Sequence, residues 1–173
     1  MGDEAMSDDE YAETIAGGRV RIDLAALADN YRLIAERVAP ARTAAVVKAD
    51  GYGLGAAPVV ATLTAAGCRD FFVVHLGEAL VLRPALADDA RLFVLNGLMP
   101  GAEALCATTD IIPVLNSHDQ ALRWRDTARR AGRPLPAVLQ FDSGMSRLGV
   151  SPDEAARLAA DSDFLDWVDL QLV

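Results

Sequence analysis

Short apolar segments recur along this chain at intervals of about 20 to 30 residues, and this rhythm constrains the fold more than any other feature. The segments are apolar along their length rather than alternating, which is typical of strands buried on both faces of a parallel sheet. Amphipathic, helix-like stretches separate them. They lie at residues 43–49, 71–76, 91–97, 111–117, 137–143 and 167–173. About six strand–helix units predict an α/β protein, either an open doubly wound sheet or a (β/α)8 barrel.

Two features bear on the choice between these architectures. No G-x-G-x-x-G motif follows the first strand, which argues against a dinucleotide-binding sheet. Six strands are too few for a barrel of eight, and the chain stops inside an apolar segment at Val173. Bare apolar strands aggregate, so we expect this chain to be part of a longer polypeptide.

Residues 1–16 are rich in acidic side chains, and we predict a disordered tail there, followed by one domain over residues 17–173. The pattern at the start of that domain predicts a short strand at 19–24 followed by a helix. The helix carries one apolar stripe, formed by Leu27, Tyr31, Ile34 and Val38.

A second helix is predicted from residue 151. Ser151 has the properties of an N-cap, Pro152 suits the first helical position, and Glu154 completes a capping box.

The composition limits the partners. The net charge is −9 and the isoelectric point is about 4.6, so nucleic acid and anionic membrane surfaces are unfavourable partners. No apolar run reaches the roughly 18 residues of a membrane span, and the acidic start does not resemble a secretory signal. Cys68 and Cys106 are interpreted as small buried residues rather than a disulfide framework. We expect a cytoplasmic protein.

Lys48 is the only lysine in a chain whose Lys and Arg residues total 16. It follows an apolar strand and precedes a turn with glycines at 51, 53 and 55, and Tyr52 lies four residues beyond it. In both candidate architectures the active site lies at this carboxyl end of the strands. An amine among apolar neighbours can act as a nucleophile or a base, which arginine cannot do. The alternative is a strand-end lysine that reaches out to water.

A second polar segment, DSGMSRLG, follows the strand at 137–143. Arg147 in this segment is suited to bind a carboxylate or another anionic oxygen. The alternative is an exposed arginine near a helix start, with Asp142 as a turn former.

Both motifs resemble those of the alanine racemases. VVKADGYGLG is similar to the cofactor-lysine motif VVKA(D/N)AYGHG, and FDSGMSRLG is similar to the D-T/S-G-M-x-R-L/I-G segment. FFVVHLGEALVLR and VRIDLAALADNYRLI resemble further stretches of the family, so the resemblance covers about residues 18–173. It implies a (β/α)8 TIM-type barrel, present here only in part, with about six of eight strands and without the C-terminal β domain of the family.

The resemblance also implies the chemistry. These enzymes use pyridoxal 5'-phosphate to interconvert L- and D-alanine for peptidoglycan precursors, and they act as homodimers. Lys48 matches the Schiff-base lysine, which is also the base on the D-isomer side. Tyr52 matches the tyrosine that hydrogen-bonds the cofactor phosphate. Arg147 matches the arginine that faces the cofactor phenolic oxygen and the substrate carboxylate. No metal is implied.

Gln140 is the departure that matters most. Many relatives have a carbamylated lysine here that holds the arginine, and glutamine cannot be carbamylated. We expect the Gln140 amide, or an anion such as chloride beside it, to hold Arg147.

The second catalytic base of the family lies outside the region that this chain matches. Tyr11, His75 and His118 are the remaining candidates, and no motif supports them. We therefore expect the 173 residues alone to be inactive. The alternatives are a broad-specificity amino-acid racemase, a non-catalytic pyridoxal-phosphate-binding barrel, a decarboxylase of the same fold, and a parallel α/β domain without a site.

Overall fold

The computed structural model describes residues 15–18 and 20–172. Within them, six parallel strands form one sheet in the sequential order β1-β2-β3-β4-β5-β6. The strands are β1 Ala45–Val46, β2 Asp70–Val73, β3 Arg91–Val94, β4 Ile111–Leu115, β5 Leu135–Leu139 and β6 Val168–Leu172. Each strand pairs with the next one along the chain, as in a (β/α) barrel, whereas a doubly wound sheet reverses its order.

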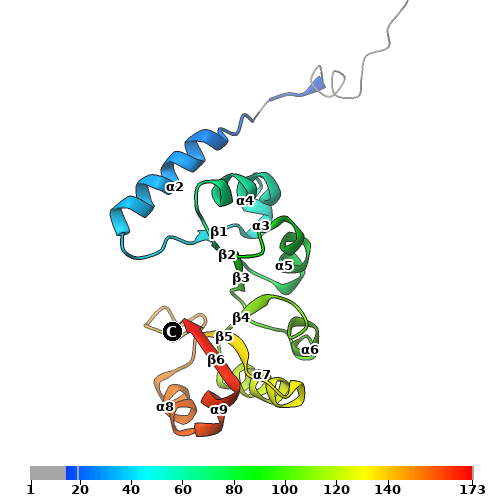
Figure 1. Cartoon of the computed structure of the whole chain (residues 1–173), viewed down its shortest axis with the longest axis vertical. Helices are drawn as coiled ribbons and strands as arrows, with labels where there is room; N and C mark the ends of the chain where they lie inside the picture. Colours follow the sequence, from blue (N-terminus) through cyan, green and yellow to red (C-terminus); the bar gives the residue numbers. More distant parts are fainter. Residues whose placement is uncertain (1–14, 19, 173) are drawn as a thin grey trace, which may run out of the picture.

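Helices connect the strands. They are α2 Leu24–Val38, α3 Lys48–Tyr52, α4 Ala56–Ala65, α5 Leu76–Leu82, the 3-10 helix η1 Arg83–Ala85, α6 Glu103–Cys106, α7 His118–Ala131, α8 Pro152–Ala160 and α9 Ser162–Trp167. Figure 1 shows the strands in one curved row, with α4, α5, α6 and α7 along its outer side. The molecule therefore has the layers of a TIM-type barrel that is present in part.

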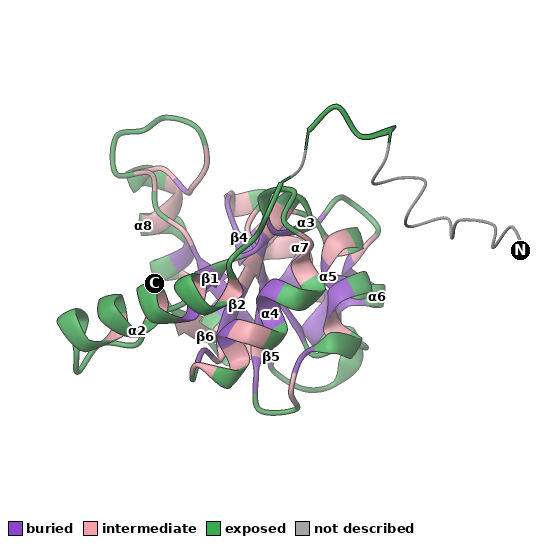
Figure 2. Ribbon diagram, turned by 90° about the horizontal axis from the view of Figure 1, so that it is seen from above, coloured by how far each residue is buried: buried purple, intermediate pink, exposed green. Residues whose placement is uncertain are grey.

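The core has two layers, as the continuous apolar strands predicted. The larger layer lies between the strands and the helices and includes Phe71, Leu92 and Trp124, each almost completely buried. The smaller one lies on the inner face of the sheet, around Phe93, which stacks on Phe72 with ring centroids 4.5 Å apart. Figure 2 shows the buried residues concentrated in the strands and on the inward faces of the helices. Cys68 and Cys106 are buried and free, which confirms the interpretation of both as packing residues.

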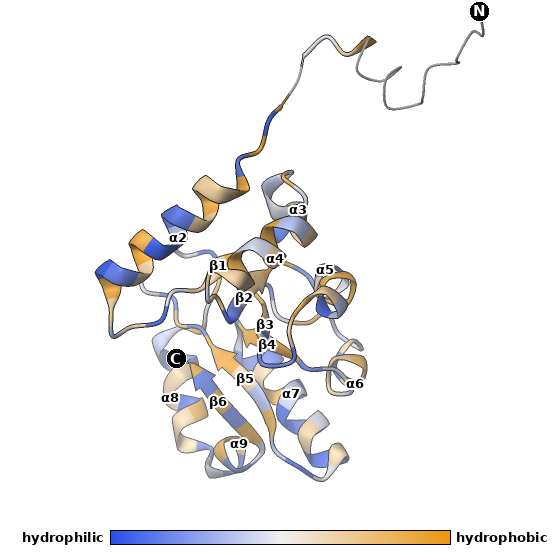
Figure 3. Cartoon of the chain, turned by 45° about the horizontal axis from the view of Figure 1, so that its top comes forward, coloured by the Kyte–Doolittle hydropathy of each residue, from blue (hydrophilic) through white to orange (hydrophobic). Residues whose placement is uncertain are grey.

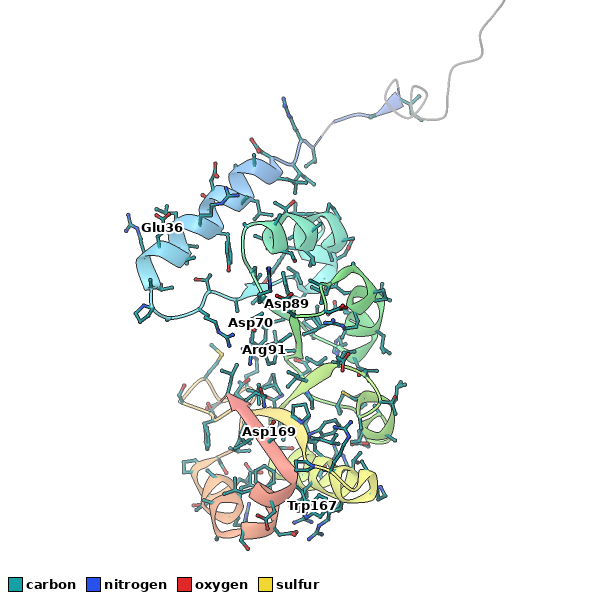
Figure 4. All side chains as sticks on the ribbon, viewed as in Figure 1. Glu36, Asp70, Asp89, Arg91, Trp167 and Asp169 are labelled. Atoms are coloured by element: carbon teal, nitrogen blue, oxygen red, sulfur yellow. The ribbon has the colours of Figure 1, made fainter. Side chains whose placement is uncertain are left out.

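One charged cluster lies at the amino-terminal ends of β2 and β3. The buried Asp70 carboxylate accepts a hydrogen bond from Arg91 Nε at 2.7 Å, and Arg42 approaches its other oxygen at 3.5 Å. Asp70 and Arg91 lie close together in Figure 4. The pairing compensates the cost of removing the carboxylate from water.

Two of the predicted segments differ from the structure at the start of the domain. Residues 20–23 form no strand, because Val20 and Ile22 are exposed and no neighbouring strand pairs with them among the described residues. The apolar stripe of α2 is covered only in part. Leu27 and Tyr31 pack against the core, whereas Ile34 and Val38 remain exposed.

The other end shows a further difference. The predicted helix from residue 151 ends at Ala160, and a separate helix, α9, precedes β6. Asp161 causes the break, since its carboxylate accepts hydrogen bonds from the backbone N–H groups of Asp163 and Phe164 and caps α9. The capping box of Ser151 and Glu154 is confirmed. Figure 3 shows β6 with alternating hydrophilic and hydrophobic residues, unlike the more uniformly hydrophobic β5.

The predicted tail falls mostly on residues 1–14, which lie outside the described residues, as does Tyr11. In the described part of the chain, no helix is both long enough and apolar enough to cross a membrane.

Candidate active site

Lys48 lies at the carboxyl end of the first strand, as predicted. β1 ends at Val46, and Val47 N extends the pairing by donating to Phe72 O at 2.8 Å. Lys48 is the next residue and begins α3. Lys48 is half-buried.

The residues after Lys48 form a left-handed turn. The φ angles of Ala49, Asp50, Gly51 and Tyr52 are +51°, +53°, +63° and +59°. A non-glycine residue in this region costs about 1–2 kcal/mol, so three of these positions are strained. A Cβ on Gly51 would lie 3.3 Å from the Ala56 backbone, so glycine is also the residue that fits there. Strain of this kind needs fixed anchors and is typical of functional sites.

Three hydrogen bonds anchor the turn. Gly51 N donates to Val47 O at 3.0 Å, and Asp50 Oδ1 accepts from Ala56 N at 2.7 Å. The third comes from another strand–helix unit, because Ala49 N donates to Glu78 Oε1 at 2.9 Å. Together they fix the backbone that carries Lys48.

Tyr52 lies beside the lysine. Lys48 Nζ is 5.8 Å from the centroid of the Tyr52 ring, within the range of a cation–π contact. The tyrosine is 62% exposed, so most of its side chain is open to solvent.

The loop of residues 142–149, here called the arginine loop, carries Arg147. Asp142 Oδ1 accepts hydrogen bonds from Gly144 N and Ser146 N, both at 2.9 Å. These two bonds hold the pKa of the Asp142 carboxyl below its ordinary value. The loop is closed at its base, where Asp142 N donates to Val150 O at 3.1 Å. The exposed Arg147 is thus presented from a closed loop rather than a loose one.

A pocket of about 390 Å³ brings the two motifs together. The residues that line it come from the carboxyl ends of β1, β2, β3 and β5 and from the arginine loop. They are Lys48, Val74, Leu95, Asn96, Gln140, Arg147 and Leu148. Of the predicted site residues, Lys48, Gln140 and Arg147 therefore share one cavity, and Tyr52 contacts the lysine from outside its lining.

Gln140 follows β5 and reaches toward the arginine loop. Its Nε2 donates to Leu148 O at 3.5 Å, so the amide contacts the backbone next to Arg147. The expectation that Gln140 or a neighbouring anion holds the Arg147 side chain stays a prediction.

Several pocket residues were not identified from the sequence. Val74 directly follows β2, and Leu95 and Asn96 directly follow β3. The rule that active sites lie at the carboxyl ends of parallel strands points to these positions. Glu78 was also missed, because its contact with Ala49 spans 29 residues of sequence.

The candidates for a second base do not join this cavity. His75 is an exposed residue before α5, and His118 is the first residue of α7. Neither lines the pocket that contains Lys48. Over residues 15–18 and 20–172, no group of three or more His, Cys, Asp and Glu residues could hold a metal ion.

The chemistry of the pocket follows from its donors. A primary amine can bond covalently to an aldehyde, and a guanidinium binds an anionic oxygen or a carboxylate. The volume lies within the range of small-molecule and cofactor sites. The residues therefore fit a ligand that combines a carbonyl carbon with anionic groups.

The chain is similar to many known racemases. A family model described as alanine racemase, N-terminal domain, matches residues 22–173. An alanine racemase of Brucella ovis is 57% identical over 165 residues, which cover 95% of this chain and 41% of the relative. A catabolic alanine racemase of Agrobacterium fabrum is 52% identical over 158 residues, 91% of this chain and again 41% of the relative.

The solved structures agree with this. An alanine racemase of Bartonella henselae, with covalently bound pyridoxal phosphate, superposes with a TM-score of 0.84 at 38% identity, covering 87% of this chain and 44% of that one. A histidine racemase of Leuconostoc mesenteroides shares the fold, with a TM-score of 0.74 at 23% identity over 84% of this chain and 39% of that one. The chain spans less than half the length of these relatives. With the family model matching most of its residues, the chain belongs to the alanine racemase family.

Proposed function

We propose that this chain supplies the lysine-bearing part of the active site of a pyridoxal-phosphate-dependent alanine racemase. The observation that carries the proposal is the pocket that joins the only lysine to Arg147 and Gln140 at the carboxyl ends of the barrel strands. The Bartonella relative, which shares this fold, holds pyridoxal phosphate covalently. A primary amine and a guanidinium in a pocket of about 390 Å³ suit a cofactor with an aldehyde and anionic groups.

Each residue would have a separate role. The Lys48 amine would bond to the cofactor, and the hydroxyl of the exposed Tyr52 would donate to its phosphate. Arg147 would bind the phenolic oxygen of the cofactor and the carboxylate of alanine, in line with the preference of guanidinium groups for such anions. Gln140 would steady the arginine loop through its hydrogen bond to Leu148 O.

The cofactor supplies an electron sink for the carbanion at the α-carbon of the substrate. The Lys48 amine would take or return the α-proton on the D-isomer side. The left-handed turn after Lys48 fixes the lysine backbone, so that the amine keeps its position while it moves a proton.

Racemisation also needs a proton donor on the opposite face of the substrate. His75 and His118 do not line the pocket, and Tyr11 lies outside the described residues. We therefore expect the 173 residues alone to form no D-alanine from L-alanine when the cofactor is added, which chiral chromatography of the product measures.

The proposal extends to the biological setting of the racemase. We place it in the cytoplasm, as a homodimer that supplies D-alanine for the cell wall.

The sole lysine permits a direct test. The purified chain is mixed with pyridoxal phosphate, reduced with borohydride and analysed by intact mass and peptide mapping. We expect one adduct at Lys48 and its loss in Lys48→Arg, which leaves the N-terminal amine as the only remaining primary amine. An adduct that forms equally well in Lys48→Arg would contradict the proposal.

A further inference from the structure

One carboxylate joins the first two strand–helix units at the candidate site. Glu78 is the third residue of α5, and its two oxygens have separate partners. Oε1 accepts from Ala49 N at 2.9 Å, and Oε2 accepts from Val74 N at 2.7 Å and His75 N at 3.3 Å. Glu78 therefore links the turn after Lys48 to the end of β2.

The position of Ala49 makes this link relevant to the lysine. Ala49 is the residue directly after Lys48 and the first of the left-handed turn. Its N–H belongs to the peptide group that follows the Cα of Lys48. A bond that fixes this N–H also fixes the direction in which the Lys48 side chain leaves the backbone.

The charge state of Glu78 is consistent with this role. Partial burial acts to raise the pKa of the Glu78 carboxyl, but the N–H groups of Val74, Ala49 and His75 outweigh it and keep the pKa below its ordinary value. The group is therefore a carboxylate at neutral pH, with both oxygens available as acceptors.

We propose that Glu78 is a positioning residue for Lys48, which holds the lysine at the pocket through the Ala49 N–H. The proposal rests on the function proposed above. Glu78 does not line the pocket, so its effect on the cofactor would be transmitted through the backbone of the turn.

The substitution Glu78→Gln tests whether Glu78 positions Lys48 or only caps α5. Its side chain offers a single acceptor oxygen, and its NH2 group is a donor that cannot accept from an N–H. Because the end of β2 offers two N–H groups, from Val74 and His75, and the turn offers one, from Ala49, we expect the glutamine oxygen to stay at β2 and its NH2 group to face Ala49. Glu78→Gln should therefore lose the bond to Ala49.

The chain contains a matched control. Glu154 is the third residue of α8 and accepts from Ser151 N at 2.8 Å and from His118 N at 3.4 Å. Its pKa is also lowered, chiefly by the hydrogen bond from the Ser151 backbone. Glu154 thus has the same kind of capping role without any contact with the lysine turn.

The experiment compares the wild-type chain with Glu78→Gln and Glu154→Gln. Thermal unfolding reports the stability lost with one carboxylate oxygen, which we expect to be similar in the two variants. The rate of the borohydride-trapped pyridoxal phosphate adduct at Lys48 reports positioning. We expect it to fall about tenfold in Glu78→Gln, the factor typical of losing one hydrogen bond to a charged group, and less than twofold in Glu154→Gln.

Hydrogen exchange gives a second readout that needs no cofactor. We expect faster exchange in residues 47–55 of Glu78→Gln. In Glu154→Gln we expect faster exchange around residues 151–160 and at His118, and unchanged exchange in residues 47–55. If Glu78→Gln does not fold, Glu78→Asp takes its place, because it keeps the charge near α5 but draws the carboxylate away from Ala49.

The outcomes distinguish the two proposals. A wild-type chain that forms no adduct at Lys48 contradicts the proposed function, and the exchange data then decide the role of Glu78 alone. A normal adduct rate in the Glu78 variant, together with unchanged exchange in residues 47–55, would overturn the positioning role.

Discussion

Gly149 closes the base of the arginine loop, and replacing it with alanine should open the loop. Its φ is +110°, and a Cβ there would lie 2.5 Å from Asp142 N and 2.6 Å from Phe141 C. These are backbone atoms that no side-chain rotation can move away. The same segment is held by two hydrogen bonds, from Asp142 N to Val150 O at 3.1 Å and from Val150 N to Gln140 O at 2.8 Å. We expect Gly149→Ala to break both.

Gly144 is the matched control within the same loop. Its φ is +119°, but a Cβ there would meet no atom within 4 Å. Both substitutions carry a backbone strain of about 1–3 kcal/mol, offset in part by about 0.4–1 kcal/mol from the stiffer unfolded chain. Only Gly149→Ala adds the clash, about 1–3 kcal/mol, and the lost hydrogen bonds, about 0.5–1.5 kcal/mol each. We expect it to destabilise the chain by at least about 2 kcal/mol more than Gly144→Ala.

Urea unfolding at pH 7, followed by the fluorescence of Trp124 and Trp167, measures the difference in the free energy of unfolding. The trapped adduct at Lys48 should also decrease in Gly149→Ala, because Arg147 leaves the pocket, and persist in Gly144→Ala. Equal unfolding midpoints for the two variants would show that the close approach at Gly149 does not constrain the loop.

Two further predictions concern the core and the ion pairs. Phe93→Ala should lower the free energy of unfolding by about 3–5 kcal/mol, because it removes a buried ring that stacks on Phe72. Urea unfolding measures this loss, and a loss under about 1 kcal/mol would show that the inner layer of the core contributes little to stability. Burial acts to raise the pKa of Glu103, but hydrogen bonds from Arg123 and the Gly101 backbone N–H lower it from 4.5. Because the folded pKa is depressed, this stability is present above pH 4.5 and is lost as the pH falls through the folded pKa. The thermal unfolding temperatures of wild type and Glu103→Gln should therefore converge below pH 4.5. A difference that stays constant with pH would show that the Glu103 carboxylate does not contribute this stability.

The strand–helix rhythm was visible in the sequence because buried parallel strands need apolar side chains on both faces. The segments at 71–76, 91–97 and 111–117 each overlap an observed strand. The segment at 19–24 differs, since its alternating pattern is that of a strand, but within the described part of the chain residues 20–23 pair with no strand. Pairing is a long-range property that a local pattern does not contain.

The residues of the candidate site also differ in whether a local sequence pattern reveals them. Lys48 and Arg147 could be found from their residue types and from the strand-end rule, because chemistry at a parallel sheet gathers at one edge. Asn96 and Leu95 obey the same rule but carry no distinctive chemistry, and so they were missed. The break at Asp161 was missed because a capping carboxylate inside a polar stretch resembles any other surface residue.

The sequence by itself determined that the chain is a parallel α/β protein with its only lysine at a strand end, because apolar periodicity and residue chemistry are local properties. Only the tertiary structure decided that Ala49, Asp50 and Tyr52 adopt left-handed conformations and that Glu78 holds the turn they form. Those conformations are unfavourable for the isolated residues. Three hydrogen bonds hold them, and one of these comes from a carboxylate 29 residues away, which the parallel pairing of β1 and β2 brings close to the Ala49 N–H.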